Sequence, residues 1–514
     1  MQRRFTAVSV SGAIAVFMFA TLYGQQPPTF RTGTTLVEIS VVVLTEDGAP
    51  VTDLTKDDLV LTERGRPRDI AFFRFDGDAP AVSSTPQLPP PTGFVTNRHT
   101  PERNAVAVVL DLVNIPLAED PFGNIGGQLS VRSQILEYLN ALPSNTYTSL
   151  FRVAELEPLE TLQPFTTDVD AVRSKVTSLK LSLPVRPSVP TGRTSRLGGG
   201  LGAEARAAEA RALADLNVQI AERGIGKTLA SLEAIGTHLA GIPGRKSLIW
   251  ISNGIPTALG DGGIFVSYEK AIRHTAQRLA NQGVAVYPVM AAGLPVIRRN
   301  DHSEVAGFNI VADITGGRVV RDNNDLTRGM TLAAVDQRGT YELGFYVPDE
   351  GDDAWHSIKV DVKRAGVSVR HREGHLAPRR ERPQNWLAKS WNSLAYQPLD
   401  STGIRLNARS DVARNRVVLQ LEVAAADVYF YEKTGQTIAD LEIGLVEIGR
   451  NGPTNVRQQP LEITRNTPPQ PIRDEMIPVK TTWPLNGETK SVRAIVRDRF
   501  TGRYGTLEMP LNGR

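Results

Sequence analysis

The chain has no cysteine among its 514 residues. This absence excludes disulfides, thiolate metal sites, cysteine nucleophiles and a lipid-modified N-terminal cysteine. Stability must therefore rest on core burial, and a content of 41% hydrophobic and 22% charged residues is ordinary for a globular protein. At this length, about three domains of ~150 residues each are expected.

Long apolar runs are missing after the first 24 residues. Arg3 and Arg4 precede an apolar stretch from Ala7 to Tyr23, which ends at Gly24 before polar residues. This order is typical of a secretory signal, and a stretch of roughly 17 residues is short for a membrane span. We predict a signal peptide at 1–24 and an exported protein that is periplasmic, at the cell surface or secreted. An uncleaved segment that anchors the protein to the envelope is the alternative.

An excess of one charge sign is missing as well. Without residues 1–24, which contain Arg3 and Arg4 but no acidic residue, the formal net charge falls from +3 to +1. Together with the absence of a basic run, this predicts no nucleic-acid partner. No Gly-X-Ser-X-Gly elbow is present. Gly226-Lys-Thr228 ends like a phosphate-binding loop, but a helical pattern precedes it where that loop needs a buried strand.

Histidine patterns also give no clear site. His371-Arg-Glu373-Gly-His375 superficially resembles a zinc helix, but its glutamate does not follow the first histidine and its glycine disfavours a helix. We interpret this segment as structural. Asp168 is predicted to cap a helix. The other five histidines are predicted to form no cluster: His99, His238, His274, His302 and His356.

The pattern of strands and helices predicts an α/β domain flanked by β-sandwich domains. Residues 105–337 alternate apolar runs with helical patterns, which predicts a doubly wound, Rossmann-like parallel sheet. Two short β units are each too small to bury a core and are predicted to pair into one sandwich. The predicted division is a signal peptide (1–24), an N-terminal β unit (34–77), a Pro-rich linker (78–104), the α/β domain (105–337), a second β unit (340–376), a connector (377–399) and a C-terminal β-sandwich (400–514).

A single carboxylate ends the most apolar strand of the α/β domain. Residues Ala105 to Asp111 form this run, and Ser252-Asn253-Gly254 follows another predicted strand. Ligands of an open parallel sheet bind at the carboxyl ends of the strands, where the strand order reverses. Asp111 and Asn253 are therefore predicted to lie at the ligand-binding edge of the sheet.

Several segments together resemble the von Willebrand factor A (VWFA) domain, and in particular the VWFA-related proteins of acidobacteria. The resemblance spans roughly residues 34–376. The segments that carry it are Val51-Thr-Asp-Leu-Thr-Lys-Asp-Asp58, Gly244-Arg-Lys-Ser-Leu-Ile-Trp-Ile-Ser-Asn-Gly254, Val286-Tyr-Pro, Thr315-Gly-Gly-Arg318, Asn323-Asn-Asp-Leu, Tyr341 to Tyr346 and Trp355-His-Ser-Ile-Lys-Val.

The resemblance implies an adhesion or interaction domain with a metal-ion-dependent site. That site uses an Asp-X-Ser-X-Ser loop, a threonine from a second loop and an aspartate from another strand end. Asp111 matches the first aspartate, but Val113 and Ile115 replace both serines, and Asn253 replaces the second aspartate. Thr228 is a candidate for the threonine.

We therefore predict an exported, non-enzymatic VWFA-like protein that mediates protein–protein interaction or adhesion in the cell envelope. Its metal-ion-dependent site is predicted to be degenerate, with Asp111, Asn114 and Asn253 as the candidate ligands. Because hard cations need several oxygen ligands and neutralising charge, no cofactor is expected. The alternatives are an adhesin with a working magnesium or manganese site and an unrecognised hydrolase. Without a metal, Asp111 would accept hydrogen bonds from neighbouring groups.

Overall fold

The computed structural model describes helices, strands and turns between Thr34 and Leu511, all within one compact unit, Gly33–Arg514. Within the described ranges, no helix combines the length and the apolar character needed to cross a bilayer. The described residues are 34–77, 90–98, 105–113, most of 132–142, 146–154, 159–179, 201–242, 244–252, 254–261, 264–290, 301–320, 335–336, 339–348, 354–377, 391, 394–433, 435–465, 475–486 and 488–511.

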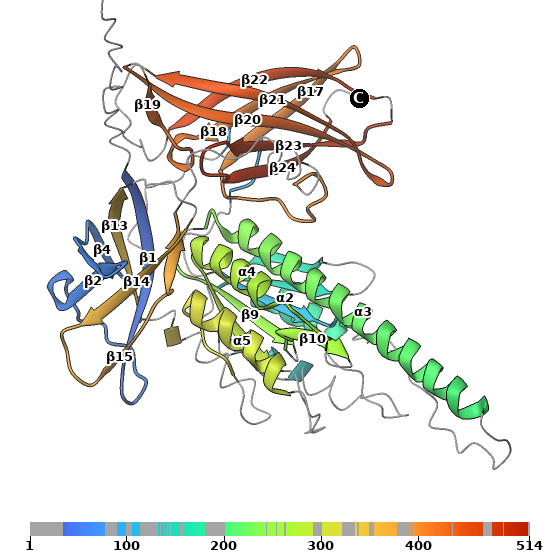
Figure 1. Cartoon of the computed structure of the whole chain (residues 1–514). Coiled ribbons are helices and arrows are strands. Elements are labelled where there is room, and N and C mark those ends of the chain that lie inside the picture. The colour runs from blue at the N-terminus through green and yellow to red at the C-terminus, as the bar shows by residue number, and fades with distance from the viewer. Residues whose placement is uncertain are drawn as a thin grey trace, which may run out of the picture. The chain divides into compact units, whose positions relative to one another are not determined.

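A five-stranded sheet forms the centre of the α/β part (Figure 1), in the order β12-β9-β6-β7-β8. Four strands are parallel, but β8 pairs with β7 in the antiparallel sense. The predicted parallel sheet is thus confirmed only in part: the sheet is mixed. The short connection from β7 to β8 allows a hairpin-like return, whereas a parallel pair needs a long crossover. The strands are β6 (Ala105–Asp111), β7 (Tyr147–Val153), β8 (Glu160–Thr166), β9 (Lys246–Ser252) and β12 (Val284–Met290).

Helices pack on both faces of this sheet. Ala105, Ala107 and Val109 of β6 share one apolar cluster with residues of α3, α4 and α5, whereas the alternate residues of β6 face α2 and helical residues near 135–139. Because successive side chains of a strand point to opposite faces, burial on both faces explains the continuous apolar run of β6. The helices are α2 (Val169–Ser178), α3 (Leu201–Leu239), α4 (Glu269–Asn281) and α5 (Asp301–Thr315).

Helix α3 is 39 residues long, and the described side chains with which it packs on the sheet lie in its C-terminal part, from Ile225 on. In Figure 1 the helix continues past the end of the sheet. Ile225, Leu232 and Ile235 recur at helical spacing and are buried against the sheet. Thr228 lies on the same stripe, three residues after Ile225 and four before Leu232, and is also buried. The packing of this apolar stripe therefore directs the Thr228 hydroxyl towards the sheet.

Two smaller features complete the α/β part. Strands β10 (Ala258–Asp261) and β11 (Ile264–Ser267) form an antiparallel hairpin. Residues 317–320, for which the sequence favours a strand, form only a single bridge, between Val320 and Val289.

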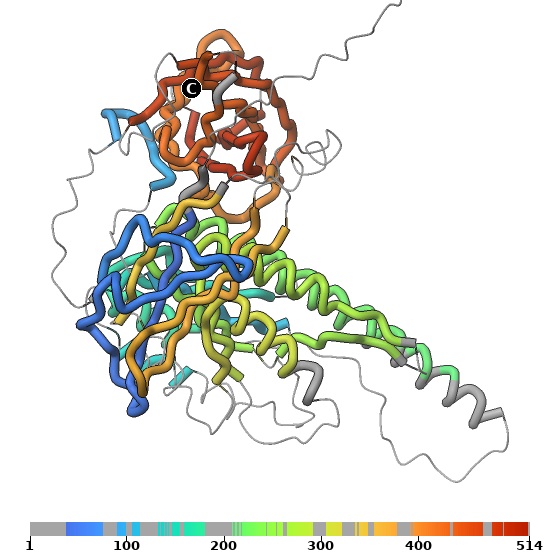
Figure 2. The backbone as a smooth tube through the Cα atoms, turned by 60° about the vertical axis from the view of Figure 1, so that its left-hand side comes forward, coloured from blue at the N-terminus to red at the C-terminus, as the bar shows by residue number. Residues whose placement is uncertain are grey.

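Strands that precede and follow the α/β part pair with each other. One sheet has the order β15-β1-β13-β4 and the other β16-β14-β2-β3. Figures 1 and 2 show the N-terminal strands side by side with those that follow the α/β part, and one apolar cluster joins the two sheets. The elements are β1 (Thr34–Thr45), η1 (Lys56–Asp58), β2 (Leu59–Glu63), β3 (Arg66–Arg68), β4 (Phe72–Gly77), β13 (Gly339–Pro348), β14 (Trp355–Val362), β15 (Val367–Arg370) and β16 (Gly374–Leu376).

The C-terminal part consists of two further sheets, β22-β18-β17-β5 and β19-β20-β23-β24 with β21 paired to β20. Strand β5 (Val95–Thr96) comes from the segment 78–104, for which the sequence predicts a linker. The Asn97 side chain donates to the carbonyls of Ser401 and Ile404, which helps to hold β5 on this sheet. The remaining elements are β17 (Leu406–Ala413), β18 (Arg416–Ala424), η2 (Ala425–Asp427), β19 (Tyr431–Lys433), β20 (Gln436–Gly449), β21 (Gly452–Arg465), β22 (Met476–Pro484), β23 (Ser491–Asp498) and β24 (Tyr504–Pro510).

Candidate functional site

Asp111 ends β6 at the point where the strand order reverses, between β6 and β9. Its side chain is fully buried. The Oδ2 atom accepts hydrogen bonds from the Thr228 hydroxyl at 3.0 Å, the Ser252 hydroxyl at 3.1 Å and the Trp250 indole at 3.2 Å. A buried carboxylate needs such donors to replace the water that it loses on folding.

The local structure explains why these donors converge. Val109 pairs with Trp250 in the parallel ladder between β6 and β9. Since alternate residues of a strand share a face, Trp250 and Ser252 lie on the same face of the sheet as Asp111. Helix α3 covers that face and contributes Thr228. The sequence singles out Thr228 as the candidate threonine, and the structure places it against Asp111, although on a helix and not on a loop.

The described donors fit a divalent cation poorly. Magnesium prefers six oxygen ligands in near-octahedral geometry, and the hydroxyls of Thr228 and Ser252 add only two oxygens to the carboxylate of Asp111. The Trp250 indole can only donate a hydrogen bond, and Val113 is half-buried against the apolar cluster. Asn114, Ile115 and Asn253 lie outside the described residues, so the predicted ligand set Asp111, Asn114 and Asn253 stays a prediction.

Other sequence patterns have structural roles. Residues 201–239 are helical, so Gly226-Lys-Thr228 forms no phosphate-binding loop. Asp168 caps α2 by accepting a hydrogen bond from the amide of Ala171 at 3.1 Å, which confirms the predicted cap.

Three segments of the VWFA resemblance meet in a buried ion network. Arg245 donates to the Tyr287 hydroxyl at 2.8 Å, and that hydroxyl donates to Asp336 at 2.8 Å. Arg318 and Arg370 also bind the Asp336 carboxylate. Burial is the largest effect on the pKa of Asp336 and raises it, in opposition to the neighbouring arginines, and burial likewise raises the pKa of Tyr287. The arginines and the Tyr287 hydroxyl therefore supply the donors that the buried Asp336 carboxylate needs.

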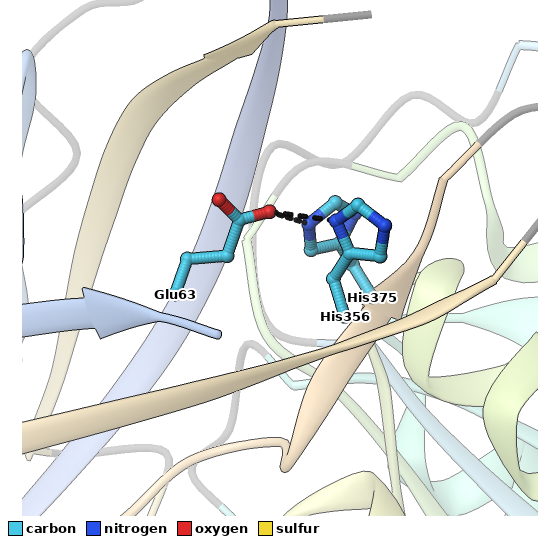
Figure 3. A group of neighbouring side chains, drawn as sticks. All are labelled: Glu63, His356 and His375. Carbon is cyan, nitrogen blue, oxygen red and sulfur yellow. Dashed lines mark hydrogen bonds and ion pairs between the residues drawn. The ribbon is translucent and has the colours of Figure 1, made fainter. Parts of the chain in front are cut away.

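A second polar cluster lies in the sandwich formed by β1–β4 and β13–β16 (Figure 3). The Glu63 Oε1 atom lies 2.9 Å from His356 Nδ1 and 2.9 Å from His375 Nε2. Arg68 binds the other oxygen, Oε2, through its Nε at 2.9 Å and its Nη2 at 2.6 Å. The side chains of Glu63, His356 and His375 are at most 3% exposed.

The environment of this cluster favours a charged glutamate. Burial acts to raise the pKa of Glu63, but hydrogen bonds from His375, His356 and Arg68 outweigh it and lower the pKa to about 2. Burial is the largest effect on the pKa of His375 and lowers it, against the hydrogen bond with Glu63. The cluster therefore combines an anionic carboxylate with imidazole nitrogens.

The prediction that the histidines form no cluster is wrong for His356, which meets His375 and Glu63 in the sandwich. His371 and Glu373 do not belong to this group: His371 Nε2 accepts the amide of Val360 at 3.1 Å. The cluster was missed because its members come from strands that are 293 and 312 residues away from Glu63 along the chain. The sequence did contain one signal: β2 and β14 alternate between buried and exposed positions, and Glu63 and His356 take positions on the buried side.

Comparisons with known proteins give no family assignment. No family model matches the sequence, and no curated protein matches it. Among solved structures, an aerotolerance-related membrane protein from Bacteroides fragilis is 14% identical, covering 46% of this chain and 99% of that chain at a TM-score of 0.26. The manganese-loaded TRAP protein of Plasmodium vivax is 15% identical, covering 55% and 95% at a TM-score of 0.23.

A third solved structure is proximal thread matrix protein 1 from the mussel byssus, with a zinc-occupied MIDAS motif. It is 11% identical and covers 46% of this chain and 48% of that chain at a TM-score of 0.27. All three TM-scores lie far below 0.5, and the likenesses therefore carry no argument about what this chain does.

Proposed function

We propose that this chain is an exported, non-enzymatic protein with a doubly wound, VWFA-like α/β domain between β-sandwich domains, and that it binds another protein in the cell envelope. The observation that supports this proposal is the state of Asp111. It stands at the ligand-binding edge of the sheet, and hydroxyl and indole donors of the protein itself engage its carboxylate. Binding at this edge then proceeds without a metal ion.

The sequence resemblance and the geometry support different parts of the proposal. The resemblance supports the class of protein, an interaction or adhesion domain, and the signal-like N-terminus supports export. The donors on Asp111 support a degenerate site, because only one carboxylate and two hydroxyl oxygens meet among the described residues. If the metal titration below detects binding that depends on Asp111, an adhesin that uses magnesium or manganese replaces the metal-independent function proposed here.

Calorimetry tests the metal dependence. The purified full chain is titrated with Mg²⁺ and then with Mn²⁺, and the same titrations are made with Asp111→Asn, which keeps the side-chain shape. Asp170→Asn on the exposed surface of α2 is the matched control. We expect no binding heat that depends on Asp111. Saturable heat that Asp111→Asn abolishes and Asp170→Asn retains would favour the metal-dependent adhesin.

Cross-linking with mass spectrometry in the native envelope tests the interaction itself. Lys270 is exposed on α4 of the α/β part, and Lys480 is exposed on β22 of the C-terminal part. We expect reproducible cross-links from Lys270 to one envelope protein, with Lys480 as the internal comparison. If neither lysine cross-links to another protein while links within the chain are recovered, the binding proposal is wrong.

A further inference from the structure

Three neighbouring strands bring Glu63, His356 and His375 to one face of a sheet. His356 and His375 are directly opposite each other in the β14–β16 ladder. Glu63 of β2 is opposite Ile358, two residues along β14 from His356. Because side chains two residues apart share a face, all three point into the sandwich, as Figure 3 shows.

We propose that Glu63, His356 and His375 bind a zinc ion that joins strands β2, β14 and β16. Glu63 Oε1, His356 Nδ1 and His375 Nε2 are the ligand atoms, and a water molecule takes the fourth position. The site lies in the β-sandwich and is independent of the function proposed for the α/β part.

The spacing of the ligand atoms suits such an ion. All three atoms lie within 4.8 Å of one another, and Glu63 Oε1 is 2.9 Å from each ring nitrogen. Ligands that are about 2.0–2.1 Å from a tetrahedral zinc ion lie about 3.3 Å apart. The two distances from Glu63 Oε1 to the ring nitrogens must therefore widen by about 0.4 Å to admit the ion, and side-chain rotation can supply this.

The chemistry of the ligands favours zinc over magnesium. Two imidazoles and one carboxylate match the nitrogen and oxygen ligands of catalytic-type zinc sites, whereas magnesium prefers oxygen alone. Arg68 holds the second oxygen of Glu63 and so orients Oε1 towards the imidazoles. The Arg68 side chain is 22% exposed, so the residue that holds Glu63 reaches solvent although the three ligands are buried.

The ion would stabilise the shortest strand of the group. Strand β16 contains three residues, Gly374–Leu376. A Cβ atom at Gly374 would meet the His356 carbonyl at 2.3 Å, so β16 packs very closely on β14 and depends on accurate placement. A zinc ion between His375 of β16, His356 of β14 and Glu63 of β2 fixes that placement. Without an ion, two imidazole N–H groups donate to Glu63, and the cluster is a hydrogen-bonded network only.

Metal titration of the untagged full chain distinguishes the two states. After treatment with a chelator and its removal, we expect one Zn²⁺ bound per chain by elemental analysis, and visible absorption bands of a four-coordinate ion with Co²⁺. X-ray absorption of the zinc-loaded chain should show nitrogen or oxygen ligands at about 2.0–2.1 Å with scattering from two imidazoles. If the native chain retains no stoichiometric zinc, or its spectrum lacks imidazole scattering, the proposal is wrong.

Matched variants assign the site. Glu63→Gln and His375→Gln should each weaken zinc binding at least tenfold, whereas His274→Gln on the exposed surface of α4 should leave it unchanged. Asp111→Asn should also leave it unchanged, which separates this site from the α/β edge. Equal affinity in the native chain and in both ligand variants overturns the assignment. If a variant does not fold, the stoichiometry and X-ray absorption of the native chain decide.

Discussion

Asp111 and Glu63 are both buried carboxylates that accept hydrogen bonds from several side chains, but their partners differ in charge. Asp111 is engaged by two hydroxyls and an indole, which are neutral. Glu63 is engaged by two imidazoles and by the guanidinium of Arg68. The first lies at the edge where a sheet of this topology binds ligands, and the second lies inside a β-sandwich.

The difference shows that the place in the fold where a ligand is expected is not the place where metal-binding side chains gather. The topology of the α/β sheet places Asp111 at the binding edge, whatever residues surround it. The ligand types that transition metals prefer gather instead at Glu63, where the fold itself predicts no site. Position in the fold therefore supports the α/β edge as the proposed binding surface, and side-chain chemistry supports the sandwich as the candidate metal centre.

The largest effect is expected at Asp111. Asp111→Ala leaves the donors of Thr228, Ser252 and Trp250 buried without this acceptor, and we expect a loss of about 4 kcal/mol in the free energy of unfolding. Denaturant titration measures it, and Asp111→Asn should cost less because the amide retains an oxygen acceptor. A loss below about 1 kcal/mol for Asp111→Ala would show that the three donors do not depend on the carboxylate.

Burial patterns explain how much of the fold was predictable. Strand β6 is buried at every position, and the predicted range 105–111 matches it. Strand β8 was missed because its residues are half-buried or exposed, which leaves no apolar run and no clean alternation. Strand β21, whose residues are half-buried or exposed, was missed because it too has no apolar run.

The two polar clusters also differ in how far local sequence patterns predict them. Asp111 was predictable because it ends an apolar run, whereas Thr228 was named through the VWFA resemblance, and its place on the apolar stripe of a helix is a signal that also points to it. Both signals are local in the sequence. The cluster of Glu63, His356 and His375 depends on strand register between segments about 300 residues apart, which no local pattern contains. The sequence therefore predicted where Asp111 lies in the sheet and missed the candidate metal centre.

The second prediction uses Lys246, a buried charge at the opposite end of β9 from Ser252. Burial is the main cause that lowers the pKa of Lys246 from 10.5 to about 8, and its ammonium donates to the carbonyl of Ile242 at 2.9 Å. Between pH 8 and 10.5 the unfolded chain retains a proton that the folded chain has lost, so folding becomes more favourable as the pH rises.

Relative to Lys246→Met, the native chain should therefore gain about 3 kcal/mol of stability across this pH window, with no relative change below pH 8. Denaturant titrations at pH 7, 8, 9 and 10 measure the difference between the two proteins. A relative stability that stays flat or falls as the pH rises would mean that Lys246 is better compensated than its burial indicates. This result calibrates the effect of burial on a cation, for comparison with the buried anion at Glu63.

A smaller effect is expected at Glu63 in chelator-treated protein. Glu63→Gln keeps the side-chain shape and one acceptor oxygen but removes the charge that pairs with Arg68, so we expect a loss of about 2 kcal/mol. Denaturant titration measures it, with Asp53→Asn as control, since the ion pair of Asp53 with Arg364 is exposed. Equal losses of stability for the two variants would show that burial does not strengthen the ion pair of Glu63 with Arg68. The charge of its partners would then not distinguish Glu63 from Asp111.

The smallest effect is expected from removing one neutral donor at Asp111. Thr228→Val keeps the side-chain volume on the apolar stripe of α3, and Asp111 retains the hydrogen bonds from Ser252 and Trp250, so the loss should be about 1 kcal/mol. Ser252→Ala should cost a similar amount, and Thr177→Val on the exposed surface of α2 serves as the control. The two hydroxyls share one acceptor atom, and in the double variant Oδ2 keeps only the Trp250 indole among these three donors. The double variant should therefore cost more than the sum of the single losses. Strictly additive losses would indicate that the donors act independently, and that the carboxylate is held by the sheet and not by the network around it.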